Sequence, residues 1–266
     1  MTIAFEKMHA NGDDFVIVDC RMRDVTLPPD LIRRLGDRQR GIGFNQIAIL
    51  RHCENATADL SFWNADGTSL AACGSATRGV AGKLMGETGA DDVTVRTSRG
   101  ILRCMRHPDG QISVDMGLPL LLWSEIPLAE AMDTARLPLA GDPAACSMGN
   151  PHCTFFVDDI DQVDVEARGR EFETHPLFPN RTNVHFVQVL DPVRIRLRIW
   201  ERGAGISPGS GSCSCAAVVN GIRRGLLSED VDVLCDGGLL RVSWNGRDGV
   251  QLAGPVEPVF CGEWTA

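Results

Sequence analysis

The stretch SPGSGSCSCAAVV, residues 207–219, places a glycine- and serine-rich turn directly before a run of small residues. Glycine and serine favour turns and the first positions of helices, and alanine favours the helix interior. We therefore predict a turn that leads into a small-residue helix over 212–223. The first backbone N–H groups of a helix have no partner inside the helix, so this turn has the shape of an anion-binding site.

A related pattern lies about 137 to 140 residues earlier in the chain. At this offset CGS (73–75) aligns with SGS (210–212), and SFWNADG (61–67) aligns with RIWERGA (198–204). Three further pairs of segments align nearly in step: 8–19 with 148–159, 43–50 with 180–187, and 93–104 with 231–242. Self-similarity at a fixed period is typical of repeated structural units. The chain is therefore predicted to be a duplicated domain, with a boundary between residues 115 and 145.

Each half is predicted to contain several strands and one buried helix. Short alternating or apolar runs are typical of strands, and they occur at 15–18, 46–50, 59–63 and 93–96, and again at 154–157, 184–190 and 193–200. Residues 75–85 and 212–223 are rich in alanine and other small residues, which predicts one buried helix in each half. The expected fold class is α+β, with two domains related by a pseudo-two-fold axis, each an antiparallel β-sheet or barrel wrapped around a central helix.

We expect the first domain to span 1–125 and to carry Cys73, and the second to span 126–266 and to carry Ser210. The C-terminal strand can return to the first domain. In this arrangement two helix N-termini face each other across a cleft, where ligands commonly bind. The N–H groups of residues 74–75 and 211–212 could together hold one carboxylate, so the expected ligand is an anion.

Composition and charge restrict the classes of function. The 266 residues are 44% hydrophobic and 23% charged, which is typical of a soluble globular protein with a sizeable core. The formal charge of −9 and the scattered basic residues argue against a nucleic-acid partner. No apolar run approaches a membrane span, and residues 1–15 lack the apolar core of a signal peptide. We expect a cytoplasmic protein with no nucleic-acid or membrane partner.

The ten cysteines show no repeated CxxC spacing and no paired histidine pattern, so the sequence predicts no zinc site, and most cysteines are interpreted as small buried hydrophobes. No dinucleotide-binding fingerprint follows a leading strand, and no lysine has the context of a pyridoxal site. The sequence thus implies neither a metal nor an organic cofactor.

Six ordered motifs carry a resemblance to a known family: MHANGDDFVIVD, RGIGFNQIAIL, WNADGTSLAACGSATR, SMGNPHCTFFVDD, HPLFPNRTNVHFVQV and WERGAGISPGSGSCSCAAVV. Over nearly its whole length the chain resembles the diaminopimelate epimerase family, which comprises amino-acid epimerases that use no pyridoxal phosphate. The resemblance implies a two-domain fold and a two-base reaction. In that reaction, one cysteine thiolate removes the α-proton and a thiol from the other half returns a proton to the opposite face. It also implies a small amino-acid substrate, and a homodimer as a candidate assembly.

Two sulfur groups suit such a reaction for a physical reason. Inversion needs a base on one face and an acid on the other, and a thiol with a pKa near 8.5, lowered at a helix N-terminus, can take either state near neutral pH. Cys73 matches the first catalytic cysteine of the family, but Ser210 stands where the family has the second. A hydroxyl is a much weaker acid than a thiol, so we expect slow or one-sided racemisation. Cys213 is a candidate for a displaced acid, and Ser210 could also be a serine introduced to disable an otherwise normal enzyme.

Two further departures concern the predicted substrate site. Asp13 stands where the family has an asparagine, which adds negative charge beside an anionic ligand, and Ser75 replaces the asparagine that commonly follows Cys-Gly. The residues that hold the distal head group of diaminopimelate in the family are intact, and Gln46 stands beside them: Asn64, Asn150, Asn183, Glu201 and Arg202. We expect Arg202 to bind a carboxylate and Glu201 an ammonium group.

His152, in the GNPH motif, matches a family histidine close to the catalytic cysteine, whereas His175 and His185 are interpreted as structural. The resulting candidate catalytic residues are Cys73, Ser210, His152 and Glu201. The candidate substrate-binding residues are Asp13, Gln46, Asn64, Gly74, Ser75, Asn150, Asn183, Glu201, Arg202, Gly211 and Ser212.

Three functions remain open from the sequence. The first is an amino-acid epimerase of the diaminopimelate type. The second is a single-base dehydratase or isomerase of a β-substituted amino acid, in which Cys73 acts with Ser210. The third is an inactive amino-acid-binding homologue. Exchange of the α-proton with solvent distinguishes the third from the first two, and formation of a keto acid distinguishes the second from the first.

Overall fold

The computed structural model describes residues 2–23 and 25–265, which form two compact units. The first unit runs to Asp115 and includes the C-terminal segment from Ala253, and the second spans Met116–Leu252. The sequence suggested a division at 125/126, whereas the units divide at 115/116. The physical reason lies in the backbone, because the N–H of Met116 donates to Val250 at 2.8 Å and the N–H of Val250 donates to Gly117 at 3.0 Å. Residues 116 and 117 are thereby tied to the end of the second unit.

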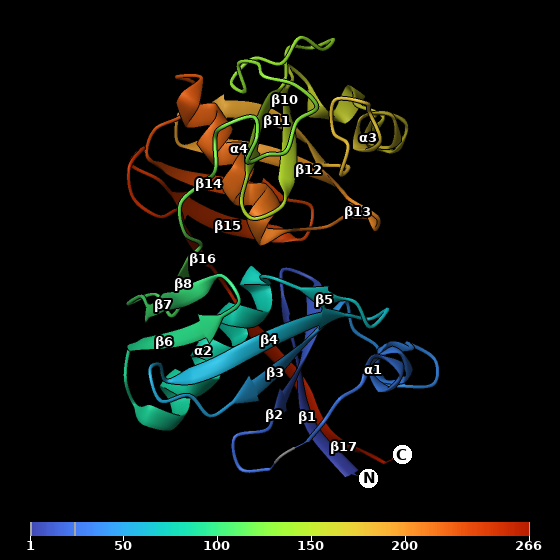
Figure 1. The fold of residues 1–266 in the computed structure, drawn as a ribbon. Coiled ribbons are helices and arrows are strands. Elements are labelled where there is room, and N and C mark those ends of the chain that lie inside the picture. Colours follow the sequence, from blue (N-terminus) through green and yellow to red (C-terminus); the bar gives the residue numbers. More distant parts are fainter. Residues whose placement is uncertain (1, 24, 266) are drawn as a thin grey trace. The chain divides into compact units, whose positions relative to one another are not determined.

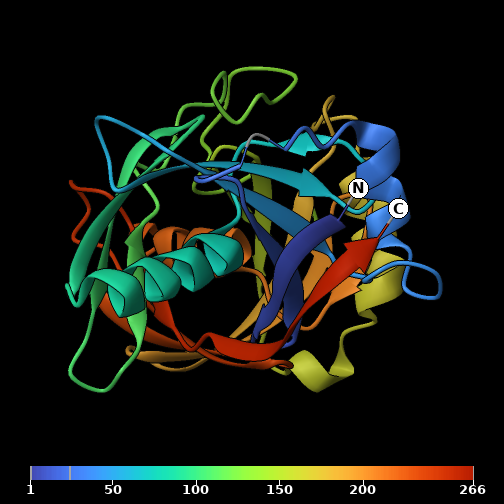
Figure 2. The same cartoon turned by 90° about the horizontal axis from the view of Figure 1, so that it is seen from below.

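The first unit is a sheet with one long and one short helix (Figure 1). Its elements are β1 (Thr2–Ala10), β2 (Asp13–Asp19), α1 (Pro29–Gly36), β3 (Gln46–Arg51), β4 (Ala58–Asn64), β5 (Ser69–Leu70), α2 (Gly74–Thr88), β6 (Asp92–Thr97), β7 (Gly100–Arg106), β8 (Ile112–Asp115) and β17 (Glu257–Thr265). Strand β1 pairs with β2 on one side and with β17 on the other, so the two ends of the chain lie side by side (Figure 2).

Helix α2 is the central helix of the first unit. It contacts β1, β2, β3, β6, β7 and β8, and its side chains from Ser75 to Ala81 are all buried. Small residues allow this close approach, since a Cβ on Gly79 would lie 2.5 Å from the ring of Phe15. The helix ends at Gly89, whose φ of 72° is the left-handed conformation that glycine adopts at little cost. The predicted helix over 75–85 is therefore confirmed, with one residue more at its start and three more at its end.

The second unit repeats the same order of elements. They are β9 (Ala144–Ser147), β10 (Pro151–Phe156), η1 (Ile160–Gln162), α3 (Val165–Glu173), β11 (Asn183–Asp191), β12 (Arg194–Glu201), β13 (Gly205–Ser207), α4 (Gly211–Arg223), β14 (Asp230–Cys235) and β15 (Gly238–Ser243), and β16 (Gln251–Gly254) crosses the division between the units. Helix α4 contacts β9, β10, β11, β12 and β15, so it is the counterpart of α2.

Strand pairing in the two units follows one scheme. In each unit a parallel pair (β2 with β3, β10 with β11) is followed by an antiparallel pair (β3 with β4, β11 with β12). A second parallel pair then joins β4 to β6 and β12 to β14. The α+β class with a central helix in each half is thus as predicted. The sheets are mixed rather than purely antiparallel, because helices and long connections separate the strands that run in parallel.

The register corrects one detail of the internal alignment. Phe15 pairs with Gln46, and His152 pairs with Asn183 in the second unit. His152 is therefore the counterpart of Phe15, and Asn150 that of Asp13, whereas the sequence alignment placed 8–19 over 148–159 and was three residues out of step. The error arose because the segments share few residues, while strand register depends on the pairing partner.

Buried apolar side chains form a separate core in each unit. In the first unit, α1 packs with Ile32 and Leu35 onto residues of β2 and β3. In the second unit, the Phe155 ring stacks 5.5 Å from that of Phe186 and lies 4.6 Å from that of Phe172 in α3. Among the described residues, no helix combines the length and the apolar character that a membrane crossing requires.

Candidate functional site

Cys73 caps the N-terminus of α2. Its backbone is extended (φ −143°, ψ 102°), and its Sγ accepts the N–H of Ala76 at 3.4 Å. Cys73 as a whole is 9% exposed, and its thiol lies 3.9 Å from Oε1 of Gln46, to which it donates. Hydrogen bonds and the helix dipole at this end both favour a negative charge on sulfur. The position therefore suits a thiol that alternates between the protonated and ionised forms.

Two amides predicted for the site face each other beside the Cys73 segment. Gln46 begins β3 and pairs in register with Asn64, the last residue of β4. The Asn64 side chain donates to the Thr68 hydroxyl at 3.0 Å across the turn that leads to β5. The first unit thus brings Gln46 into contact with Cys73 and places Asn64 opposite Gln46.

Asp13 begins β2 and contacts the first turn of α2. Asn45 donates to Asp13 Oδ1 at 3.0 Å, and the Ser75 side chain also hydrogen-bonds this carboxylate. Burial raises the pKa of Asp13 in spite of these bonds. Ser75 is therefore the partner of Asp13, so the two departures predicted separately from the sequence form one hydrogen-bonded pair.

Ser210 caps α4 at the position equivalent to Cys73, with an extended backbone (φ −151°, ψ 126°). Its side chain makes no capping bond to the helix and instead hydrogen-bonds the thiol of Cys213. Gly211 and Ser212 follow as the first residues of the helix. The hydroxyl thus points at a buried sulfur rather than at the N–H groups of its own helix.

Cys213 is fully buried in the first turn of α4. Burial raises the pKa of its thiol well above the ordinary value, and the negative charge of Glu201 raises it further. A thiol in this environment is held in its protonated form. Cys213 therefore lies next to Ser210, and a protonated thiol is compatible with the displaced acid suggested by the sequence, which stays a prediction.

His152 lies in β10 and is fully buried. Its Nε2 lies 2.9 Å from Oδ1 of Asn150, and its Nδ1 lies 3.1 Å from Nε2 of His185. Burial lowers the pKa of His152 well below its ordinary value, and His185 and Arg202 lower it further. At neutral pH this histidine is uncharged, so it acts through hydrogen bonds.

His185, which the sequence analysis interpreted as structural, lies beside His152. It lies in β11 opposite Thr154 and is fully buried, and burial lowers its pKa to about 3. The parallel pairing of β10 with β11 places His152 and His185 two residues apart in register and thus on one face.

The remaining predicted residues gather at the end of β12. The Asn183 side chain donates to the carbonyl of Pro151 at 2.9 Å and accepts the backbone N–H of Arg202 at 3.0 Å. The Arg202 side chain is exposed, and its guanidinium donates to the carbonyl of Asn180 at 3.0 Å. Glu201, half-buried, ends β12. The second unit thus joins Asn183 to Arg202, Asn150 to His152, and Ser210 to Cys213.

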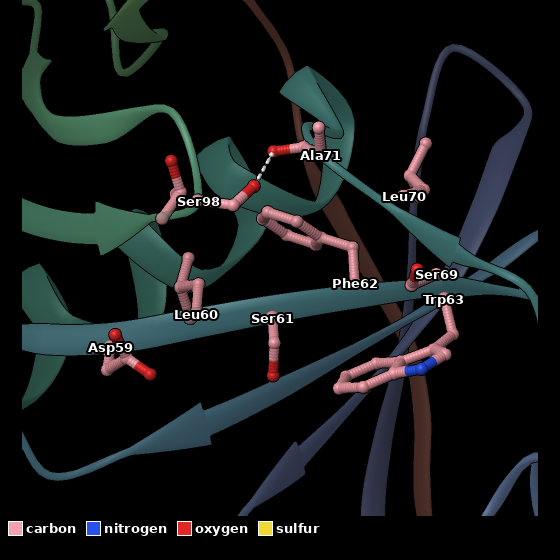
Figure 3. A pocket seen from close by; sticks show the side chains of 10 residues that line it. Asp59, Leu60, Ser61, Phe62, Trp63, Ser69, Leu70, Ala71 and Ser98 are labelled. Atoms are coloured by element: carbon pink, nitrogen blue, oxygen red, sulfur yellow. Dashed lines mark hydrogen bonds between the residues drawn. The ribbon is translucent and has the colours of Figure 1, made fainter.

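A pocket of about 540 Å³ lies elsewhere in the first unit (Figure 3). It is lined by β4, β5 and neighbouring residues, among them Leu60, Phe62 and Trp63. At its edge the Ser98 hydroxyl donates to the carbonyl of Ala71 at 3.0 Å. Its lining includes no predicted site residue and no cationic side chain that would bind a carboxylate. We therefore do not place the amino-acid site there.

Comparison with solved structures supports the fold. A PhzF-family phenazine biosynthesis protein of Bacillus anthracis superimposes with a TM-score of 0.72 at 16% identity over 100% of both chains. A hydroxyproline epimerase of Agrobacterium vitis superimposes with a TM-score of 0.67 at 15% identity over 98% of this chain and 92% of that one. At these identities the likeness concerns the fold alone, and it agrees with the predicted α+β class.

Comparison of sequences shows the family. The model of the diaminopimelate epimerase family matches residues 5–122 and 144–259. The diaminopimelate epimerase of Acidiphilium cryptum is 47% identical over 98% of this chain and 96% of its own length, and that of Gluconobacter oxydans is 47% identical over 98% and 99%. The chain belongs to the diaminopimelate epimerase family.

Proposed function

We propose that this protein is a cofactor-independent isomerase that interconverts L,L- and meso-diaminopimelate. The observation that carries the proposal is the 47% identity to curated diaminopimelate epimerases over nearly the whole of both chains. The capping position of Cys73 on α2 supports it, because this is where an acid–base thiol is needed. The dehydratase and the inactive homologue have no comparable support.

In this proposal Cys73, as the thiolate, removes the α-proton of the substrate. The N–H of Ala76 bonds the sulfur at 3.4 Å and lowers the cost of the ionised form. No pyridoxal ring spreads the resulting negative charge, so hydrogen bonds and helix dipoles must stabilise it. The backbone N–H groups of Gly74 and Ser75, with those of Gly211 and Ser212, are proposed to bind the α-carboxylate.

Ser210 is proposed to return a proton to the opposite face of the α-carbon. Its hydroxyl can protonate a carbanion, but it is a poor base in the reverse direction. We therefore expect slower turnover than a thiol at this position would give. His152 is proposed to position the amide of Asn150, to which it is hydrogen-bonded at 2.9 Å.

The distal head group of the substrate, which consists of its second carboxylate and ammonium group, is proposed to bind to a separate set of side chains. Arg202 would hold the carboxylate and Glu201 the ammonium group. The amides of Gln46, Asn64, Asn150 and Asn183 would fix the stereochemistry of this end. Asp13, which carries negative charge when ionised, would favour an ammonium group over a carboxylate.

We also propose a cytoplasmic location, which suits a biosynthetic epimerase, and a homodimer as the assembly. Sedimentation equilibrium would test the assembly directly.

Replacement of the catalytic thiol tests the function. We expect Cys73→Ser to lower the rate of epimerisation by at least about 100-fold, since a positioned base contributes roughly 10² to 10⁴ in rate. We expect Ser210→Cys to raise the rate, because it restores a thiol acid. Cys261→Ala is the control, because Cys261 is exposed on β17 and outside the proposed site. Equal rates for the wild-type protein and Cys73→Ser would refute the proposal.

A further inference from the structure

We propose that His152, His185 and Cys213 form a binding site for a thiophilic divalent metal ion such as Zn²⁺. One ligand atom of each residue lies within 4.8 Å of the other two, and the facing histidine nitrogens are 3.1 Å apart. In a tetrahedral zinc site, nitrogen lies about 2.0 Å and sulfur about 2.3 Å from the ion, which separates two nitrogens by about 3.3 Å and a nitrogen from a sulfur by about 3.5 Å. The nitrogen pair lies close to the separation that a zinc site needs, and small side-chain movements within the 4.8 Å limit would bring all three ligand atoms to it.

Three regular elements place these ligands. His152 pairs with Asn183, and Thr154 pairs with His185, along the parallel strands β10 and β11. Because side chains alternate along strands, His152 and His185 lie on the same face of this pair. Helix α4 covers that face, and Cys213 lies in its first turn. Ligands on strands and helices hold their positions better than ligands on loops.

The hydrogen bonds of His152 leave the correct nitrogen for a metal. Oδ1 of Asn150 can only accept, so Nε2 of His152 carries the proton in the 2.9 Å contact. Nδ1, which faces His185, then has a free lone pair. A histidine that donates through one ring nitrogen and binds metal through the other is the usual arrangement in metal sites.

The Thr154 hydroxyl can hydrogen-bond His185 both in the absence and in the presence of a metal ion. The Thr154 hydroxyl lies 3.2 Å from Nδ1 of His185, and it accepts a hydrogen bond from the Asn220 side chain at 3.0 Å. When the hydroxyl donates to Nδ1, Nε2 of His185 carries a proton and bonds to His152. When the hydroxyl rotates and accepts from Nδ1, Nε2 presents a lone pair to an ion. Rotation of the hydroxyl, together with movement of the His185 proton from Nε2 to Nδ1, therefore converts the histidine pair into two metal ligands.

The charges around the cluster are compatible with a cation. Both histidines are uncharged, as metal ligands must be, and an ion would displace the thiol proton of Cys213. The Glu201 charge, which disfavours the free Cys213 thiolate, favours a cation there. Arg202 acts in the opposite sense on His152, but its side chain is exposed and therefore screened by solvent.

The sequence did not reveal this site because its ligands come from three separate segments rather than from a compact zinc motif. Three protein ligands leave a fourth position open, as in zinc sites that bind water or substrate. Ser210, whose side chain contacts the Cys213 thiol, lies beside the cluster. A bound ion would thus change the surroundings of the proposed proton donor.

Cobalt substitution tests the proposal. The full-length protein is dialysed against a chelator and titrated with Co²⁺, which absorbs light through thiolate-to-cobalt charge transfer. We expect this band to saturate at one Co²⁺ per chain and to disappear when Zn²⁺ displaces the cobalt. Cys213→Ala should abolish the band and weaken Zn²⁺ binding by at least about 100-fold, since even the loss of a hydrogen-bond partner of a metal ligand costs about 10- to 100-fold.

Cys146→Ala is the matched control, because Cys146 is a fully buried thiol of the same unit that bonds the carbonyl of Ala216 instead of a histidine. It should bind as the wild-type protein does. If Cys213→Ala fails to fold, Cys213→Ser keeps the volume and still removes the thiolate band. A band that is absent from the wild-type protein, or unchanged in the Cys213 variants, would overturn the proposal. Neither result depends on epimerase activity, so the proposed function is tested separately.

Discussion

Cys73 and Ser210 occupy equivalent capping positions but make different hydrogen bonds. The Cys73 sulfur accepts an N–H of its own helix, whereas the Ser210 hydroxyl contacts the thiol of Cys213. The first arrangement favours a negative charge on the capping atom. The second supplies no helix N–H to an alkoxide, which agrees with a role for Ser210 as a proton donor rather than a base.

The neighbouring residues Asp13 and Asp14 are predicted to have opposite effects on stability. Burial raises the pKa of Asp13 above its ordinary value of 3.8, so above that value the folded chain binds more protons than the unfolded chain. Stability then falls as the pH rises through the interval between 3.8 and the raised pKa. At pH 7 we expect Asp13→Asn to raise the free energy of unfolding, and this gain to vanish as the pH falls to 3.8. Urea unfolding at several pH values measures it.

Asp14→Asn is the paired control, for which we expect the free energy of unfolding to change in the opposite direction. Burial acts to raise the pKa of Asp14, but the hydrogen bonds from Arg38 at 2.7 Å and from Lys7 at 2.8 Å outweigh it and lower the pKa. The ionised carboxylate therefore stabilises the fold above pH 3.8, and this stability is lost as the pH falls through the lowered pKa. We expect Asp14→Asn to cost about 1 to 3 kcal/mol at pH 7. Changes of the same sign in both variants would contradict this account.

At the scale of elements, the two central helices were predicted closely because local signals define them. A capping residue, glycine and a run of small residues mark the start of α2 and of α4, and Gly89 marks the end of α2. The parallel strand pairs could not be predicted in the same way. Strand direction within a pair depends on how the chain crosses between the strands, and no local pattern records that crossing.

Helix α2 offers a direct test of its close packing. A Cβ on Gly79 would lie 2.5 Å from the Phe15 ring, while a Cβ on Gly86 would meet nothing within 4 Å. We expect Gly79→Ala to destabilise the protein by about 1 to 3 kcal/mol through overpacking. Gly86→Ala should stabilise it by about 0.5 to 1 kcal/mol, because alanine is the better helix former. Thermal unfolding of both variants gives the comparison, and a neutral Gly79→Ala would mean that α2 does not pack on Phe15 as described.

At the scale of the whole molecule, the duplication was visible in the sequence because Trp63 and Trp200 precede their capping residues at the same distance. The structure repeats the order of strands and helices in both units. The sequence did not bring His185 together with His152, because their contact arises only when β10 and β11 pair. Strand pairing and helix packing bring together residues that are far apart in the sequence, so these residues show no characteristic spacing. The cluster of His152, His185 and Cys213 was missed for the same reason.

The central claim is that the chain removes and returns the α-proton of diaminopimelate. The most direct measurement is proton NMR of the protein with L,L-diaminopimelate in D₂O. We predict that the α-proton signal is lost while signals of the meso isomer grow, and that both changes are nearly absent with Cys73→Ser. An α-proton signal that persists, or a keto acid and ammonia in place of the meso isomer, would contradict the assignment as an epimerase.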